Sequence, residues 1–170
     1  QSGGEERANV NLRVVYGVSA SHRAVKQRLQ PMLSTWLKGE KAVVLFDTVD
    51  AKEKATLSEL STQNISAAFS EQPSGKDTAI TNGNGAWKVF PLLRSMLSAH
   101  PSADFFVLVD DDAFVIKENL RELLLLHSNP KHALYMGRAI AFGPLMSSYV
   151  DGASGIILNA EAARRIGLAL

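Results

Sequence analysis

Apolar and polar residues alternate in two different patterns along this chain. Short apolar runs rich in β-branched and aromatic residues are typical of strands that are buried on both faces. Apolar residues three or four positions apart, or a polar helix-forming composition, predict helices. The apolar runs predict strands at residues 11–19, 41–46, 65–69, 105–109, 134–138 and 156–158. The helical segments are residues 21–37, 51–60, 86–99, 117–127 and 160–166.

Single residues set the limits of several of these elements. Ser21 and Asn159 stand where the first and last helices would begin, and we expect both to act as helix caps. Pro31 falls inside the first helical pattern, so we expect a bend or a boundary there. Long polar or glycine-containing stretches predict loops at residues 70–84 and 139–148.

The order of the elements predicts the fold class. Strand, helix and strand follow one another from the start, which favours parallel strands joined by right-handed crossovers. We therefore expect an α/β fold with a mostly parallel sheet flanked by helices. The 170 residues suit one domain, and residues 11–170 are expected to form it, behind a polar, flexible leader at residues 1–10.

Composition excludes several classes of function. The formal net charge of +1 gives no electrostatic case for nucleic acid or for an acidic membrane surface. The sequence holds no cysteine, so disulfides, thiolate metal sites and a cysteine nucleophile are absent. No apolar run reaches the ~20 residues that span a bilayer. Asn64 begins a single glycosylation sequon, which points weakly to a secretory compartment.

The strongest chemical signal is a run of three carboxylates at the end of the most apolar strand. Asp110, Asp111 and Asp112 follow the run at residues 105–109 directly. Parallel α/β sheets bind ligands just outside the carboxyl ends of their strands. Three adjacent anions are costly to gather without a cation, and carboxylate oxygens suit Mg²⁺, Mn²⁺ or Ca²⁺. A metal or phosphate site is therefore favoured over a solvated acidic turn.

Three chemistries use such an acidic strand end. An EF-hand loop counted from Asp110 would need glycine at its sixth position and glutamate at its twelfth, where Val115 and Arg121 stand, so it is excluded. An aspartyl phosphotransfer enzyme would also place Asp110 or Asp112 here, although Phe114 is unusual for that class. The third chemistry is a metal that holds the diphosphate of a nucleotide-activated substrate. A glycine-containing turn at residues 152–155, able to let backbone approach a ligand, suits that third reading.

Several ordered motifs resemble one glycosyltransferase family. The motif Val-Asp-Asp-Asp-Ala-Phe-Val is followed by Tyr-Met-Gly-Arg at residues 135–138 and by Tyr-Val-Asp-Gly-Ala-Ser-Gly at residues 149–155. Upstream, Arg28 precedes a Thr-Trp pair, and Gly83 precedes Trp87 and Lys88. In this order the motifs resemble the β-1,3-glycosyltransferases of the Fringe and core-1 galactosyltransferase group, over residues 12–166. The resemblance implies a GT-A fold, Mn²⁺ (or Mg²⁺) as cofactor, a UDP-sugar donor and a glycan or glycoprotein acceptor.

The resemblance also assigns roles around the metal. Asp112 is implied as the direct metal ligand. Asp110 and Asp111 are implied to contact the ribose or the water shell of the metal, so Asp110 joins Asp112 as a candidate metal residue. Val18 and Ser19, at the end of the first strand, are implied to lie near the uracil.

Further positions are implied to contact the donor from other segments. Arg28 and Lys88 match basic positions that touch the donor or brace its site. Gly152 and Ala153 belong to a turn that is implied to lie beneath the sugar or the acceptor. Asp151, just before that turn, has two interpretations: it points to the sugar hydroxyls, or it caps the turn.

The resemblance leaves one part of the site unassigned. In that family a Glu-Asp motif and a later histidine supply the catalytic base and complete the metal site, and neither is present in this sequence. We therefore expect a C-terminally truncated catalytic domain that holds the donor half of the site, with the catalytic residue unknown. The family likeness also implies a Golgi lumen protein of type II, with a membrane anchor outside this chain. The alternatives are a Mg²⁺-dependent phosphotransfer domain with an aspartyl nucleophile, and a non-catalytic nucleotide- or glycan-binding module.

Overall fold

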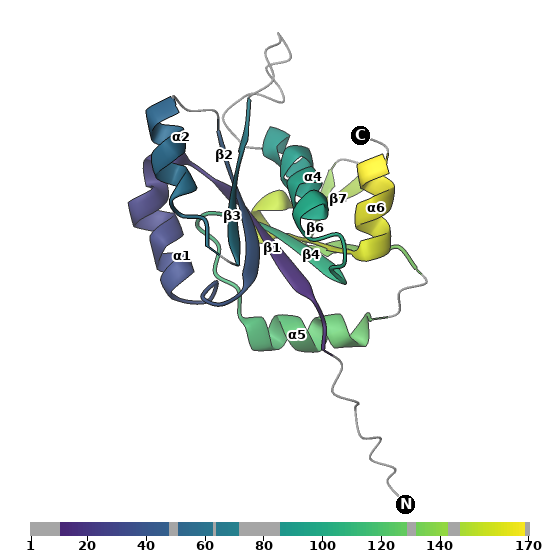
Figure 1. The fold of residues 1–170 in the computed structure, drawn as a ribbon. Helices are drawn as coiled ribbons and strands as arrows, with labels where there is room; N and C mark the ends of the chain where they lie inside the picture. Colours follow the sequence, from purple (N-terminus) through teal and green to yellow (C-terminus); the bar gives the residue numbers. More distant parts are fainter. Residues whose placement is uncertain are drawn as a thin grey trace, which may run out of the picture.

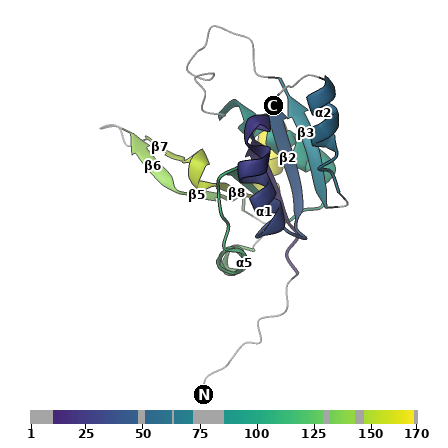
Figure 2. The same cartoon turned by 90° about the vertical axis from the view of Figure 1, so that its left-hand side faces the viewer.

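The fold is a three-layered α/β sandwich built on one large sheet (Figure 1). The computed structural model of the chain describes residues 11–47, 51–62, 64–71, 86–128, 132–142 and 147–168. Six strands form the sheet in the order β3-β2-β1-β4-β8-β5, and a separate pair, β6-β7, extends beyond it (Figure 2). The predicted leader at residues 1–10 and residues 72–84 of the predicted loop at residues 70–84 lie outside the described residues.

The strands of the main sheet are mostly parallel. β1 pairs in parallel with both β2 and β4, and β2 pairs in parallel with β3. β8 runs antiparallel to β4 and to β5. The strand bounds are β1 Val14–Ala20, β2 Lys41–Asp47, β3 Ile65–Ser70, β4 Phe105–Asp110, β5 Tyr135–Gly137, β6 Ala139–Phe142, β7 Ser147–Val150 and β8 Ile156–Asn159.

Helices cover both faces of the sheet. One apolar cluster joins α1, with the turns before it, to one face, and a second joins α4 and α6 to the other (Figure 1). The helix bounds are η1 His22–Ala24, η2 Val25–Leu29, α1 Gln30–Ser34, α2 Ala51–Ser58, η3 Ala86–Lys88, α4 Val89–Ala99, α5 Lys117–Leu126, η4 Gly152–Ser154 and α6 Ala160–Leu168. The predicted α/β class, a mostly parallel sheet flanked by helices, is confirmed.

Strand alternation divides the core between the two faces. In β4, Val107 and Val109 belong to the cluster on the α1 side, whereas Phe106 and Leu108 pack with Leu92, Leu93 and Met96 of α4. Successive side chains of a strand point to opposite faces. Asp110, the last residue of β4, therefore lies on the α4 face with Phe106 and Leu108, whereas Asp111 and Asp112 follow in a turn.

The close approach of α4 to the sheet depends on a residue without a side chain. A Cβ at Gly17 of β1 would collide with the Met96 sulfur and would lie 3.1 Å from Leu92 Cγ. The glycine therefore lets α4 pack directly over β1. This contact fixes the start of α4, and with it Lys88, relative to the strand ends.

Two predictions about local structure are wrong. Residues 139–148 are not all loop, because Ala139–Phe142 and Ser147–Val150 pair as the antiparallel strands β6 and β7. Ser21 does not cap the first helix with its side chain. Its backbone N–H instead donates to Asp111 Oδ2, at 2.9 Å, which gives the start of this helix a partner from β4.

Two other local predictions are confirmed. The helical segment that holds Pro31 is divided, with a 3₁₀ turn, a π-helical stretch and an α-helix in succession from His22 to Ser34. Asn159 caps α6, because its Oδ1 accepts from the Ala162 N–H at 2.9 Å. Among the described residues, no helix combines the length and the apolar character that crossing a membrane requires.

Candidate functional site

The carboxyl ends of three parallel strands gather the candidate residues at one edge of the sheet. β1, β2 and β4 end at Ala20, Asp47 and Asp110, and Ser19 lies opposite Asp110 in the register. From β1 the chain adds β2 and β3 on one side and β4 on the other, so the strand order reverses between β1 and β4. Open α/β sheets bind ligands at such a reversal. The three aspartates therefore lie at the position that the topology favours for a ligand.

Asp111 continues the α1 face of β4 and is buried there. Its side chain is 7% exposed. Oδ2 accepts from the Ser21 N–H at 2.9 Å, and Oδ1 accepts from Arg28 Nη1 at 3.0 Å. Its own N–H donates to the Ser19 carbonyl at 3.1 Å. Asp111 thus ties the end of β4 to the end of β1.

Arg28 reaches the same edge from the π-helical stretch η2. The neighbouring Leu29 is buried, while the Arg28 side chain is 49% exposed. Its Nη1 atom contacts Asp111 and also lies 3.4 Å from Asp112 Oδ2. Asp111 first, and Asp112 after it, raise the pKa of Arg28. The predicted role of Arg28, contact with the donor or support of its site, stays a prediction, and the structure places its guanidinium beside the acidic motif.

Asp110 lies on the α4 face and is half-buried. Burial raises the pKa of the Asp110 carboxyl, and the charges of Asp112 and Asp111 raise it further. The Lys88 charge opposes these effects, and Asp151 adds to them. The net result of burial and of these charges is a raised pKa at Asp110.

Lys88 is the cation on the α4 face. Only 6% of the residue is exposed. Its Nζ donates to the Ala20 carbonyl at 3.0 Å and forms an ion pair with Asp47 Oδ1 at 2.7 Å. Alternation along β2 places Asp47 on the same face as Val43 and Leu45, which explains why the ammonium meets it there. Lys88 therefore links the start of α4 to the ends of β1 and β2.

The fit of a divalent cation depends on Asp110 and Asp112. Asp112 is exposed, with 62% of its side chain accessible, and Arg28 Nη1 approaches its Oδ2 at 3.4 Å. Among the described residues, no group of three or more acidic, histidine or cysteine side chains converges on one point. Mg²⁺-like cations commonly take one or two carboxylates and complete their shell with water and substrate phosphates. Asp110 and Asp112 fit that arrangement, whereas both carboxylate oxygens of Asp111 already accept hydrogen bonds from the protein.

The glycine-containing turn lies at the same edge. A Cβ at Gly155 would lie 3.5 Å from Val109 Cγ1, so this turn adjoins the end of β4. A Cβ at Gly152 would meet nothing within 4 Å, which leaves space above the turn. Asp151 Oδ2 accepts from Ser154 Oγ at 2.7 Å, so Asp151 does cap this turn. Ala153 belongs to η4, between Gly152 and Ser154.

The structure brings several of the predicted site residues to one edge of the sheet and adds one residue that the sequence analysis did not name. Ser19 lies beside Asp110, as expected, but Val18 is fully buried in the core on the α1 side, so only its main chain is near the edge. Asp47, which directly follows the predicted strand at residues 41–46, is not among the residues that the sequence predicted for the site. Its signal was its position after the buried run at residues 41–46, the same signal that singled out Asp110.

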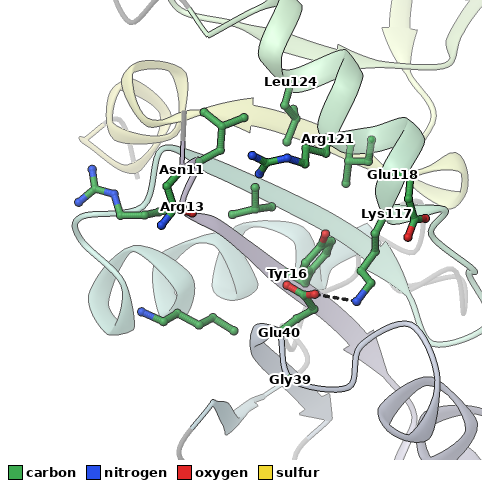
Figure 3. Close-up of a pocket in the computed structure, with 13 residues that line it drawn as sticks. Asn11, Arg13, Tyr16, Gly39, Glu40, Lys117, Glu118, Arg121 and Leu124 are labelled. Atoms are coloured by element: carbon green, nitrogen blue, oxygen red, sulfur yellow. Dashed lines mark hydrogen bonds and ion pairs between the residues drawn. The ribbon is translucent and has the colours of Figure 1, made fainter. Parts of the chain in front are cut away.

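A separate cavity of about 440 Å³ lies at the opposite end of the strands (Figure 3). The first residues of β1 and β2 and one side of α5 line it. Lys117 Nζ pairs there with Glu40 Oε1 at 2.7 Å, next to the ring of Tyr16 (Figure 3). The cavity includes none of the three aspartates, so we place the candidate active site at the acidic edge and not here.

Tyr16 in this cavity gives a pH-dependent prediction. Burial first, and the Glu40 charge second, raise the pKa of Tyr16 to about 12. The unfolded phenol ionises near pH ~10, so the contribution of Tyr16 to the free energy of unfolding should be constant below that pH and fall as the pH rises toward the folded pKa. A tyrosinate absorbance titration should show a late component that Tyr16→Phe removes. If the variant leaves the last part of the titration unchanged, the burial of Tyr16 is wrong.

Comparison with known proteins gives one family and two solved structures. The model of the galactosyl transferase GMA12/MNN10 family matches residues 40–150, which include Asp47, Lys88 and the three aspartates. A 4-diphosphocytidyl-2C-methyl-D-erythritol synthase from Anaerococcus prevotii is 10% identical, with a TM-score of 0.43 over 93% of this chain and 76% of its own. Mouse xyloside xylosyltransferase 1, in its apo form, is 15% identical, with a TM-score of 0.35 over 94% and 70%. Because both TM-scores are low, we draw no conclusion on function from these two structures.

Proposed function

The chain belongs to the galactosyl transferase GMA12/MNN10 family, and from this we propose that it transfers a hexose from a UDP-sugar to a glycan or glycoprotein acceptor with the help of a divalent cation. The family makes the chain a glycosyltransferase, and its name makes galactose the first sugar to test. The motif resemblance to the Fringe and core-1 group adds an inverting transfer with a β-1,3 linkage to the proposal. The same resemblance adds a place of action in the Golgi lumen.

One observation carries the proposal: two carboxylates remain available at the strand reversal. Asp110 and Asp112 lie between β1 and β4, where an open α/β sheet binds its ligand. Asp110 and Asp112 would hold Mn²⁺ or Mg²⁺, which would stabilise the negative charge that develops on the departing diphosphate. Arg28 adds a positive charge from the α1 face, only 3.4 Å from Asp112.

The remaining residues bind and orient the donor in this proposal. The ends of β1 and β2 form the nucleoside side, where Ser19 is partly exposed and Asp47 offers a carboxylate. The turn at Gly152 and Gly155 forms the sugar side, because the backbone there leaves room above it. An inverting transfer also needs a carboxylate that takes the proton of the acceptor hydroxyl, and we assign no residue of this chain to that step.

Calorimetric titration of UDP tests the proposal directly. We expect UDP to bind in the presence of Mn²⁺ and the binding to disappear in EDTA. UDP binding that EDTA leaves unchanged would contradict the proposed role of a divalent cation. If the folded chain binds no UDP, the proposed UDP-sugar donor is wrong. Stable trapping by beryllofluoride would instead indicate an aspartyl phosphotransfer enzyme.

To identify the transferred sugar and the linkage, the reaction product has to be analysed. With UDP-galactose and a glycan acceptor, nuclear magnetic resonance of the product distinguishes a β-1,3 bond from other outcomes. An α-linked product, or another position of attachment, would overturn the Fringe-like detail and leave the glycosyltransferase assignment intact.

A further inference from the structure

We infer that Asp111 is a positioning residue that sets Arg28 for the anionic donor, and not itself a ligand of the metal or the nucleotide. The inference rests on the proposed function, since it concerns the same donor site. It also departs from the sequence resemblance, which implied contact of Asp111 with the ribose or with the water shell of the metal. We refer to the contact between these two side chains as the Arg28–Asp111 brace.

The surroundings of Asp111 leave it poorly placed to serve a ligand. Its side chain is 7% exposed, against 62% for Asp112. Each of its oxygens already accepts from the protein, one from Ser21 and the other from Arg28. A ligand would have to displace a donor from a buried carboxylate, and an unpaired buried polar group is unfavourable.

The side of the sheet on which Asp111 lies explains why this aspartate is the one whose oxygens accept hydrogen bonds from Ser21 and Arg28. Val107 and Val109 face the cluster that contains Leu29, and Asp111, one residue beyond the end of β4, lies on the same side and contacts Arg28 of η2. Arg28 directly precedes the buried Leu29 and reaches Asp111 from that stretch. Asp110, the last residue of β4, lies on the α4 face, and Asp112 is largely exposed, with Arg28 Nη1 3.4 Å from its Oδ2.

The brace fixes where the Arg28 charge lies. Nη1 is held at 3.0 Å from Asp111 and 3.4 Å from Asp112, although the side chain is half exposed. A guanidinium carries five N–H donors, so most of them remain for a further anion after this contact. A UDP diphosphate held beside Asp112 would meet this preset cation, and loss of Asp111 would release it to solvent.

A double-mutant cycle on binding tests the inference. The proteins are the unmodified chain, Asp111→Asn, Arg28→Gln and the double variant, with Asp112→Asn as the reference for a lost metal ligand. We expect Asp111→Asn to weaken UDP binding in Mn²⁺ about tenfold, as Arg28→Gln does, because both remove one charge-assisted contact. The double variant should bind UDP at most about twofold more weakly than whichever single variant binds it less tightly. The losses of affinity are not additive when two residues act as a unit.

The metal measured without nucleotide separates positioning from ligation. We expect Mn²⁺ binding without UDP to stay within about threefold of the unmodified chain in Asp111→Asn, whereas Asp112→Asn loses it. A merely structural role would lower both kinds of binding together. Equal loss of Mn²⁺ binding in Asp111→Asn and Asp112→Asn would overturn the inference, and so would additive losses of UDP binding.

Two outcomes remain distinguishable if a variant or the proposed function fails. If Asp111→Asn does not fold, Arg28→Gln, whose side chain is half exposed, still has to show weaker UDP binding with unchanged Mn²⁺ binding. If the unmodified chain binds no UDP, the proposed function fails. Urea unfolding of the unmodified chain, the two single variants of the cycle and the double variant then tests the Arg28–Asp111 brace. The brace is wrong if the shifts in the urea midpoint of the two single variants add up to the shift of the double variant.

Discussion

Replacing Asp112 by Asn is expected to weaken Mn²⁺-dependent UDP binding by at least about 100-fold, the largest functional loss that we predict for one substitution. Asn keeps the shape of the side chain and removes the negative charge that a hard divalent cation requires. Asp112 is 62% exposed, so the fold has little to lose. The free energy of unfolding should therefore change by no more than about 0.5 kcal/mol.

The measurement compares UDP titrations in Mn²⁺ and in EDTA for the variant and for a control. Glu59→Gln makes the same change of charge on an exposed residue of the α2–β3 segment, far along the chain from the acidic edge. The control should bind UDP as the unmodified chain does. Binding by Asp112→Asn within about threefold of the unmodified chain would contradict its role as a metal ligand, because loss of even an indirect metal contact costs 10- to 100-fold, roughly.

Most of the sheet could be predicted from the sequence because buried parallel strands have a simple signature. The runs at residues 41–46 and 105–109 lie within one residue of β2 and β4 as observed. The parallel pairing of β1 and β2 followed from the helical segment between them. Local composition and chain order carry this information without any long-range contact.

The parts that were missed depend on contacts between distant segments. The strands β6 and β7 are short, and only their pairing with each other makes them a ribbon. The N–H of Ser21 finds its partner 90 residues further along the chain, which no cap pattern at residue 21 could indicate. The π-helical stretch η2 likewise has no local signal in the residues that form it.

The candidate site shows the same division between local and distant information. The three aspartates could be found from their place after an apolar strand. Their separate environments could not, because Arg28 and Lys88 come from different faces of the sheet. Alternation along β4 could have placed Asp110 on the α4 face once the faces were known. Asp47 could have been added to the site because it follows the apolar run of β2 as Asp110 follows that of β4.

The largest expected loss of stability follows from Lys88→Met, at about 3 kcal/mol. Met keeps the length of the side chain and its contact with apolar neighbours, but it leaves the Ala20 carbonyl without its hydrogen-bond donor and the Asp47 carboxylate without its ion pair. Asp47 is about one-third exposed, at 35% of its side chain, so water recovers part of its solvation. For a chain of this length the loss corresponds to a fall in Tm of about 6–12 °C.

Urea and thermal unfolding of matched variants separate this pair from a general effect of removing a lysine. Lys26→Met, at an exposed position of η2, should change the free energy of unfolding by less than about 0.5 kcal/mol. Adding Asp47→Asn to Lys88→Met should restore about 1 kcal/mol, because the lone carboxylate is then gone. If Lys88→Met and Lys26→Met have equal effects, the ammonium does not hold the strand ends. The 6% exposure of Lys88 argues against that result, since a buried cation without partners would itself destabilise the fold.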